Sequence, residues 1–210
     1  MSGQDRSMIH ILCVDISTAS ESRYQALYEK ASPERKMRAD GFLHWEDQLR
    51  CVTAEALLRY ALGGNCRVET GQWGKPYLPE RPDFRFNLSH GGKWVVLAYG
   101  ERDVGIDVEP ERQDAKFSAL ARRYFTPEEQ DYVFRSEDHQ PRRFFEIWTK
   151  KESNLKYWGT GLGKSLSSFS VLNEEPGLHF HHRILPDGSH LSLCAEESQM
   201  EFSTVDIETL

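Results

Sequence analysis

Two carboxylates stand two positions apart in an otherwise apolar run of the chain. In the segment VGIDVE, residues 104–109, valine and isoleucine alternate with Asp107 and Glu109. Because successive side chains of a β-strand point to opposite faces, this strand is predicted to carry both carboxylates on one face. One interpretation is a strand with a solvated face, which is common in antiparallel sheets. The other is a divalent cation between the two carboxylates, which offsets their repulsion and the cost of removing them from water.

A third carboxylate and a lysine follow on a predicted helix. In WTKKESNLK, Glu152 and Lys156 are four residues apart and therefore share one helix face. For this helix alone, the simplest interpretation is an exposed ion pair worth about 0.3–0.5 kcal/mol. Together with Asp107 and Glu109, Glu152 completes a set of oxygen ligands of the kind that Mg²⁺ selects. Mg²⁺ usually keeps positions for water and substrate phosphate, so the motifs predict a phosphate ester or anhydride as substrate.

Basic residues lie in several short segments of the first half of the chain. Arg35 and Arg38 share a face of one predicted helix, and Arg50 lies on the next. Lys75 belongs to the loop segment GKP, and His90 ends the strand segment FNLSH. A charge run such as ERKMR is usually a solvated helix face, and a histidine at a strand end is more often a local hydrogen-bonding residue. By themselves these residues do not establish a binding site.

A glycine-rich segment, WGTGLGKS, resembles a phosphate-binding loop but lacks its spacing. Such a loop ending at Ser165 needs glycine at the position that Trp158 occupies, and a strand before it where a helix is predicted here. We therefore predict that Gly159 and Gly161 end the helix and turn the chain.

The elements predicted around these motifs mix strands and helices without the strict alternation of a parallel sheet. Helical patterns cover 21–30, a segment capped by Ser32, 45–62, a segment opened by the capping box at Thr126, and 141–158. Strand patterns cover 8–15, 84–87, 93–99, 103–109, 169–172, 178–184 and 190–195. The sequence thus predicts an α+β protein of two closely packed lobes, residues 1–103 and 104–210.

Composition and charge narrow the functional classes. The 210 residues carry a net charge of −7, which argues against nucleic acid or an anionic membrane surface as the main partner. The longest apolar run, residues 94–99, is too short to span a bilayer. The N-terminal residues lack a secretion signal, and the four cysteines show no paired or zinc-like spacing, so we expect reduced thiols and a cytoplasmic location.

In combination and in order, these motifs resemble 4'-phosphopantetheinyl transferases of the larger Sfp type. The resemblance runs from SPERKMRADGF through GKPYLP, FNLSH, VGIDVE and WTKKESNLKYWGTGL to about SFSV. VGIDVE alone is weakly specific, whereas the whole ordered set is highly specific. The resemblance implies a monomer of two pseudo-symmetric lobes, each a small, mainly antiparallel sheet packed with helices, with coenzyme A bound between them.

The resemblance also implies the reaction and the residues that carry it. The phosphopantetheine arm of coenzyme A would move to a serine of an apo acyl or peptidyl carrier protein, leaving adenosine 3',5'-bisphosphate. Asp107, Glu109 and Glu152 match the family's Mg²⁺ ligands, Glu152 also its candidate general base, and Lys156 the residue that holds the pyrophosphate. The residues that match the binding site for the rest of coenzyme A are Lys75 and Pro76 on the adenine side, and Arg35, Arg38, Ser89 and His90, with Arg50 nearby, at the 3'-phosphate.

One position departs from the family, and two other functions remain open on the residues alone. Cys51 stands where the family often has threonine, and a thiol is a poor hydrogen-bond donor. A Mg²⁺-dependent phosphohydrolase could use the same three carboxylates with water as the nucleophile. A coenzyme A or nucleotide-binding module could instead carry the carboxylates on a solvated face. The combined motifs favour the transferase.

Overall fold

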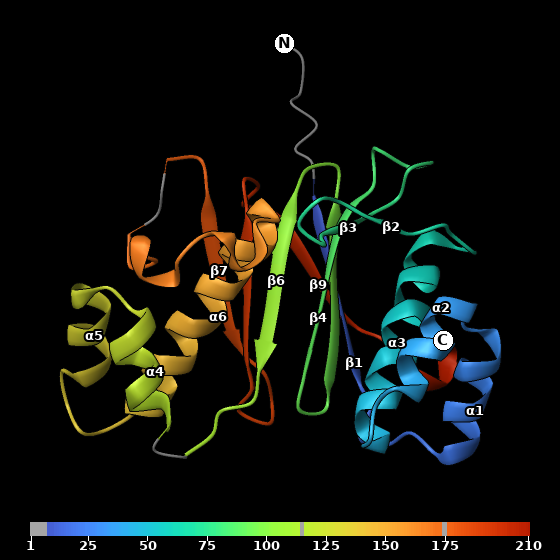
Figure 1. The fold of residues 1–210 in the computed structure, drawn as a ribbon, viewed down its shortest axis with the longest axis horizontal. Helices are drawn as coiled ribbons and strands as arrows, with labels where there is room; N and C mark the ends of the chain where they lie inside the picture. The colour runs from blue at the N-terminus through green and yellow to red at the C-terminus, as the bar shows by residue number, and fades with distance from the viewer. Residues whose placement is uncertain (1–7, 114–115, 174–175) are drawn as a thin grey trace, which may run out of the picture.

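Three β-sheets form the frame of the described residues, 8–113, 116–173 and 176–210, in this computed structural model (Figure 1). The four-stranded sheet has the order β4 (Arg85–Gly91), β5 (Trp94–Gly100), β1 (Ile9–Asp15) and β9 (Met200–Thr204). The three-stranded sheet has the order β6 (Val104–Glu109), β8 (His190–Ala195) and β7 (His179–Ile184). The third sheet pairs β2 (Glu69–Thr70) with β3 (Pro76–Tyr77). Only the β1–β9 pair is parallel among these described strands, so the predicted α+β class with mainly antiparallel sheets is confirmed.

Helices lie on the two outer sides of the paired sheets (Figure 1). On one side are α1 (Glu21–Lys30), α2 (Pro33–Asp40) and α3 (Trp45–Leu62); on the other are α4 (Lys116–Tyr124), α5 (Pro127–Phe134) and α6 (Gln140–Trp158). Three short 3₁₀ helices cover Gly161–Gly163, Leu166–Ser168 and Ile207–Thr209. In the described ranges, no helix combines the length and apolarity that crossing a membrane requires.

Helix ends follow the signals predicted from the sequence. Ser32 caps α2 by accepting a hydrogen bond from the backbone N–H of Arg35, and Thr126 with Glu129 forms the capping box of α5. Gly159 ends α6 with a φ of 63°, a left-handed conformation that glycine adopts without steric cost. The glycine-rich segment after α6 is therefore a helix end and a turn, as predicted.

The two larger sheets share one hydrophobic core. Its buried members include Ile11 and Val96 from the four-stranded sheet and Ile106 and Leu193 from the three-stranded sheet. Burying each such side chain contributes about 1.5–3 kcal/mol. A second core lies between the four-stranded sheet and α1–α3, and a third gathers aromatic side chains of α4–α6. The shared core sets the two sheets in a fixed relation, which any site between them requires.

Strands β4 and β6 approach each other where the two sheets meet (Figure 1). The backbone N–H of Ile106 donates to Asn87 Oδ1 across this boundary at 2.9 Å. A Cβ at Gly91 would lie 2.3 Å from the carbonyl oxygen of Val108, so only glycine allows this approach. On its other side, β6 packs on α6, which brings the motif-bearing segments of both halves together.

One predicted strand is wrong, and three strands were not predicted. Residues 169–172 follow a 3₁₀ helix and form no strand. Their backbone groups bond to side chains instead, because Lys151 donates to the carbonyl of Phe169 and Glu129 accepts from the N–H of Val171. The short strands β2 and β3, and the C-terminal β9, were missed.

The C-terminal segment returns to the first half of the chain. β9 pairs in parallel with β1, and Val205 and Ile207 are buried in the core between the four-stranded sheet and α1–α3. The C-terminus accordingly lies beside α1 and α3 in Figure 1. The division into lobes of residues 1–103 and 104–210 stays a proposal, although β9 pairs with β1 of the four-stranded sheet.

Candidate active site

A pocket of about 370 Å³ opens between β4, β6 and α6. It contains the three carboxylates predicted as metal ligands, together with the predicted lysine, serine and histidine. The lining residues are Leu88, Ser89, His90, Asp107, Glu109, Trp148, Glu152 and Lys156. Residues from both predicted lobes thus meet at one place.

Asp107 is buried at the base of this pocket and is held by two donors. The residue is 4% exposed, so the interpretation of a strand with a solvated face is wrong for Asp107. Its Oδ1 accepts from Lys156 Nζ at 2.6 Å and from Ser89 Oγ at 3.0 Å, and Lys156 also donates to Ser89 Oγ at 2.9 Å. The second oxygen, Oδ2, is buried and has no hydrogen-bond partner among the described residues. A carboxylate oxygen left in this state is costly and is suited to a cation.

Glu109 and Glu152 stand beside Asp107 in an environment that disfavours negative charge. Burial, followed by the charge of Asp107, raises the pKa of Glu109 to about 7. Burial and the charge of Asp107 also raise the pKa of Glu152, while Lys156 opposes this shift. The three carboxylates of the pocket therefore carry more negative charge than the single ammonium group of Lys156 neutralises.

The donor set fits a hard divalent cation. Asp107, Glu109 and Glu152 offer only oxygen, and one of those oxygens is buried without a partner. Across the described ranges, no three His, Cys, Asp or Glu side chains already form a cluster that could hold a metal ion. The carboxylates would therefore have to move closer together to bind an ion.

Positive charge surrounds His90 at the rim of the pocket. Desolvation of the ring, followed by the charges of Arg50, Lys156 and Arg38, lowers the pKa of His90. Arg38 is exposed on α2, and its side chain forms no hydrogen bond or ion pair with any residue that the structure describes. His90 and Arg38 are therefore available to an anion.

Arg35 and Arg50 already have partners in the fold. Arg35 Nε lies 3.3 Å from Glu55 Oε2, and its guanidinium lies over the buried thiol of Cys51. Arg50 donates to Asp47 at 3.0 Å and to the carbonyl of Gly92 at 3.0 Å. The structure does not bring Arg35 to the carboxylate pocket, and Arg50 lines a neighbouring one. Their contact with a phosphate stays a prediction.

A second pocket, of about 310 Å³, adjoins the first one. The two share Leu88, Glu152 and Lys156, so they form one groove. This second pocket also contains the predicted Lys75 and Pro76. Lys75 Nζ donates to Asp103 at 3.0 Å and to the carbonyl of Tyr157 at 2.6 Å, so it also joins the two halves of the chain.

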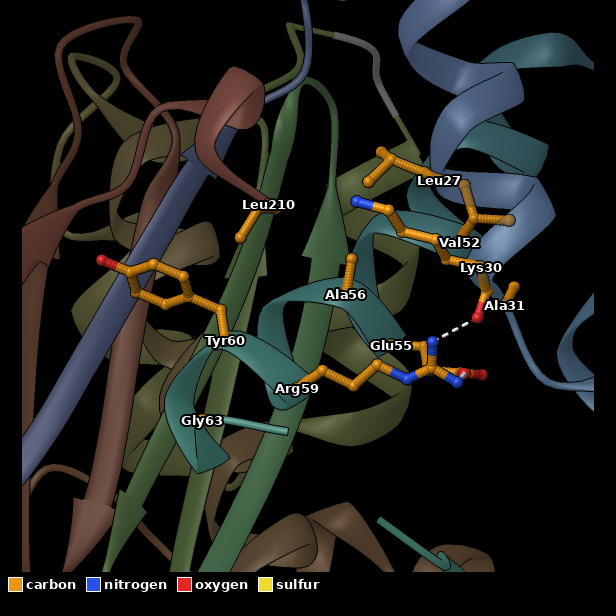
Figure 2. Close-up of a pocket in the computed structure, with 10 residues that line it drawn as sticks. All are labelled: Leu27, Lys30, Ala31, Val52, Glu55, Ala56, Arg59, Tyr60, Gly63 and Leu210. Carbon is orange, nitrogen blue, oxygen red and sulfur yellow. Dashed lines mark hydrogen bonds and ion pairs between the residues drawn. The ribbon is translucent and has the colours of Figure 1, made fainter. Parts of the chain in front are cut away.

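A separate pocket of about 260 Å³ lies between α1, α3 and the C-terminal Leu210 (Figure 2). It contains none of the residues predicted for the site. Arg59 pairs with Glu55 at 2.5 Å and donates to the carbonyl of Lys30, as the dashed line in Figure 2 marks. Glu55 also accepts from Ser32 at the start of α2. We interpret this ion group as the structural link between α1, α2 and α3.

Sequence reasoning missed several residues that line the groove, among them Trp148 and Asn87. Trp148 lies one helical turn before Glu152, and Asn87 lies two positions before Ser89 on the same face of β4. Both lie in segments that carry predicted site residues, FNLSH and WTKKESNLK. The spacing of four on the helix and of two on the strand could have identified them.

Comparison with known proteins places the chain in a family. A model of the 4'-phosphopantetheinyl transferase superfamily matches residues 103–204. The chain is 34% identical over 154 residues to the 4'-phosphopantetheinyl transferase Sfp of Bacillus subtilis (strain 168), covering 70% of this chain and 68% of that protein. A second Bacillus subtilis 4'-phosphopantetheinyl transferase is 34% identical over 182 residues, covering 82% and 78%. The 4'-phosphopantetheinyl transferase HetI of Nostoc is 35% identical over 156 residues, covering 69% and 66%.

An α+β fold with three carboxylates and a lysine in a cleft between two sheets defines an enzyme that handles a phosphate ester or anhydride. The chain belongs to the 4'-phosphopantetheinyl transferase superfamily, and it resembles the Sfp type. The resemblance noted in the sequence is thus confirmed. The phosphohydrolase alternative has no support from these relatives, which are all named as transferases.

Proposed function

We propose that this enzyme transfers the 4'-phosphopantetheine group of coenzyme A to a serine of an apo acyl or peptidyl carrier protein. Adenosine 3',5'-bisphosphate is the second product. The observation that carries the proposal is the meeting of Asp107, Glu109, Glu152 and Lys156 in one pocket, on elements that the superfamily match includes.

The three carboxylates are proposed to hold Mg²⁺ together with the pyrophosphate of coenzyme A. Bound Mg²⁺ supplies neutralisation of the charge that develops on the pyrophosphate oxygens. Asp107 offers Oδ2, which has no partner among the described residues, and Glu109 and Glu152 offer carboxylates whose charge a cation would stabilise. Lys156 adds a fixed positive charge at the same place.

The proton of the attacking serine needs an acceptor, because a hydroxyl is a weak nucleophile. We assign this role to Glu152, the carboxylate of this pocket that matches the family's candidate general base. The serine oxygen forms a bond to the phosphorus that carries pantetheine, and the bond from that phosphorus to the bridging oxygen breaks. The bridging oxygen and its electron pair leave with the bisphosphate.

The remaining residues are proposed to bind the rest of coenzyme A. Arg38 and His90 face the 3'-phosphate, supported by their mutual proximity and by the absence of a partner for Arg38 among the described residues. Arg38 can bind a phosphate through two parallel N–H donors. The further residues assigned to this site are Arg35, Arg50 and Ser89 near the 3'-phosphate, and Lys75 and Pro76 on the adenine side.

The setting of the reaction is also a proposal. We propose a monomer that acts in the cytoplasm, with coenzyme A and the carrier protein as partners and without nucleic acid or membrane. The four cysteines are free, which supports a reducing compartment. The net charge of −7 disfavours anionic polymers and anionic membrane surfaces.

The test is to incubate the protein with coenzyme A, Mg²⁺ and an apo carrier protein and to weigh the carrier. We expect a mass gain of one phosphopantetheine arm, which excess chelator abolishes. Asp107→Asn and Glu152→Gln should each slow transfer about a hundredfold or more, because each removes an oxygen ligand. Glu146→Gln is the matched control, because Glu146 lies on α6 and bonds to Lys150 and Tyr132 outside the groove.

Two results would contradict this proposal. Release of phosphate or nucleotide at an equal rate without any carrier would identify a hydrolase. A mass gain that persists in excess chelator would remove the metal from the mechanism.

A further inference from the structure

The buried amide of Asn87 connects the two sheets beside the groove. Asn87 is 5% exposed on β4, and its Oδ1 accepts the backbone N–H of Ile106 on β6 at 2.9 Å. β4 and β6 belong to different sheets, so this side chain replaces a strand-to-strand hydrogen bond at their boundary. The carboxylate of Asp107 follows directly after the bonded N–H.

This hydrogen bond determines which way the amide points. A backbone N–H can only be met by the oxygen of the amide, so Nδ2 and its two N–H donors must face away from Ile106. Nδ2 forms no hydrogen bond with any residue that the structure describes, and it is not sealed from solvent. Asn87 lines the pocket that Lys75 and Lys156 also line. The free donor is therefore available inside the groove.

The surroundings of this donor favour an anionic oxygen as its acceptor. Lys156 belongs to both pockets of the groove, and Asn87 shares one face of β4 with Ser89, which already bonds to Lys156. A fixed amide N–H in a pocket that two lysines also line is suited to a phosphate oxygen, and hydrogen bonds to charged groups are the stronger ones.

We propose that Asn87 is a further binding residue for coenzyme A, whose Nδ2 donates a hydrogen bond to an oxygen of the pyrophosphate. This inference rests on the proposed function. It gives one side chain two tasks: Oδ1 holds β6 and Asp107 in place, and Nδ2 binds the substrate. Because the first task pre-orients the amide, the second requires no side-chain rearrangement on binding.

Two substitutions separate these tasks. Asn87→Asp keeps an oxygen for the N–H of Ile106 and removes the donor, whereas Asn87→Leu removes both. We expect Asn87→Asp to raise the Kd of coenzyme A, measured by calorimetry on the folded protein, about tenfold or more. Asn87→Leu should melt at a clearly lower temperature, because the buried N–H loses its partner.

The new carboxylate of Asn87→Asp also repels phosphate, and salt screens a buried pair of charges only weakly. Asn87→Leu separates the two effects, because it removes the N–H donor without adding a charge; its Kd is measured below its melting temperature. A Kd raised about tenfold in both variants supports the lost hydrogen bond. A Kd raised in Asn87→Asp alone is due to repulsion and contradicts the proposed hydrogen bond.

NMR spectroscopy of the wild-type protein tests the inference even if the variants do not fold. The side-chain amide protons of Asn87 should shift in the NMR spectrum and exchange more slowly with solvent when coenzyme A is added. Unchanged amide signals at saturating coenzyme A would overturn this inference alone. Failure of the wild type to bind coenzyme A would instead overturn the proposed function.

Discussion

Asp107 carries its charge in a buried position because a lysine already stands against it. The ammonium of Lys156 lies 2.6 Å from Oδ1, and the hydroxyl of Ser89 supplies a second donor. The sequence suggested a metal ion as the group that makes two adjacent carboxylates compatible. The lysine performs part of that role, but burial, followed by the charge of Asp107, still raises the pKa of Glu109 to about 7. A divalent ion would therefore add to the lysine rather than replace it.

The side chain of Arg38 lies close to His90 and is exposed. It has no partner among the described residues and acts on the pKa of His90, so we expect it to bind the 3'-phosphate. Arg38→Ala should weaken coenzyme A binding about tenfold or more, yet scarcely change binding of dephospho-coenzyme A. Calorimetry with both ligands measures this. Lys36→Ala is the matched control, because Lys36 bonds to the carbonyl of Glu29 instead.

If Arg38→Ala weakens binding of coenzyme A and of dephospho-coenzyme A equally, Arg38 does not bind the 3'-phosphate. It would then contact the carrier protein or stabilise the fold.

The sequence could predict which residues of the second half meet, because strand and helix periods place them. Asp107 and Glu109 share a face of β6, Glu152 and Lys156 share a face of α6, and all four line one pocket. The partner of Arg35 could not be predicted, since Glu55 lies on another helix and no local pattern pairs them. Partners that are distant in the sequence depend on packing, which periodicity does not contain.

At the scale of elements, the contact of β6 with α6 depends on a residue without a side chain. A Cβ at Gly105 would lie 2.0 Å from the carbonyl oxygen of Ser153 and 2.3 Å from the backbone nitrogen of Tyr157. These are backbone atoms of α6, so the helix itself would have to move. Gly105 thus sets the distance between Asp107 on the strand and Lys156 on the helix.

Gly105→Ala should therefore lower both stability and activity. We expect the free energy of unfolding to fall by about 3 kcal/mol or more, because the displaced backbone cannot relax as a side chain would. Transfer should fall further than in proportion to the folded fraction, since α6 carries two residues of the site. Chemical denaturation and the carrier mass assay measure the two effects. Gly64→Ala is the control, because a Cβ there meets nothing within 4 Å.

Wild-type stability and activity in Gly105→Ala would contradict the close packing of these elements.

Long, regular elements were predictable, whereas those shaped by buried charge were not. α6 and β8 follow from their apolar periodicity. The predicted strand at 169–172 failed because the pair of Lys151 and Glu129, both fully buried and 2.8 Å apart, takes up the backbone groups of that segment. Neither residue signals burial in the sequence, since lysine and glutamate are among the most exposed types. Short strands such as β2 and β3 carry too few residues to form a pattern.

At the scale of the whole molecule, the half-buried His182 and the buried His190 link stability to pH. His182 and His190 lie 3.0 Å apart, nitrogen to nitrogen, between β7 and β8. Burial lowers the pKa of His182 to about 4, although the charge of Glu146 opposes the shift. Because the folded pKa lies below the unfolded value of about 6.5, the unfolded chain binds more protons between these values. This contribution to stability is present above pH 6.5 and is lost as the pH falls toward 4.

We therefore expect the free energy of unfolding to fall between pH 7 and pH 5, and to fall less steeply in His182→Gln. Urea denaturation of both proteins at several pH values measures the difference between their free energies of unfolding. The carboxylates are common to both proteins, so their contribution cancels in this difference. Parallel curves for the two proteins would show that His182 is not neutral and buried in the folded state.

The C-terminal segment makes the two halves of the chain a single folding unit. β9 is the edge strand beside β1, the N–H of Ile9 donates to the carbonyl of Gln199, and Val205 and Ile207 are buried against α1–α3. No pattern in the sequence predicted this return, because a parallel pair of the first and last strands has no local signal.

A chain ended after Ser198 should therefore be strongly destabilised. Loss of the two buried side chains alone removes about 3 kcal/mol or more, a large share of the roughly 5–15 kcal/mol that folds a domain. We expect a lower midpoint of denaturation and loss of transfer, although every residue of the groove is still present. Adding a synthetic peptide of residues 199–210 should restore part of both by occupying the vacant edge of β1. A shortened chain as stable as the full one would mean that residues 1–103 complete their own core, and the peptide would then have no effect.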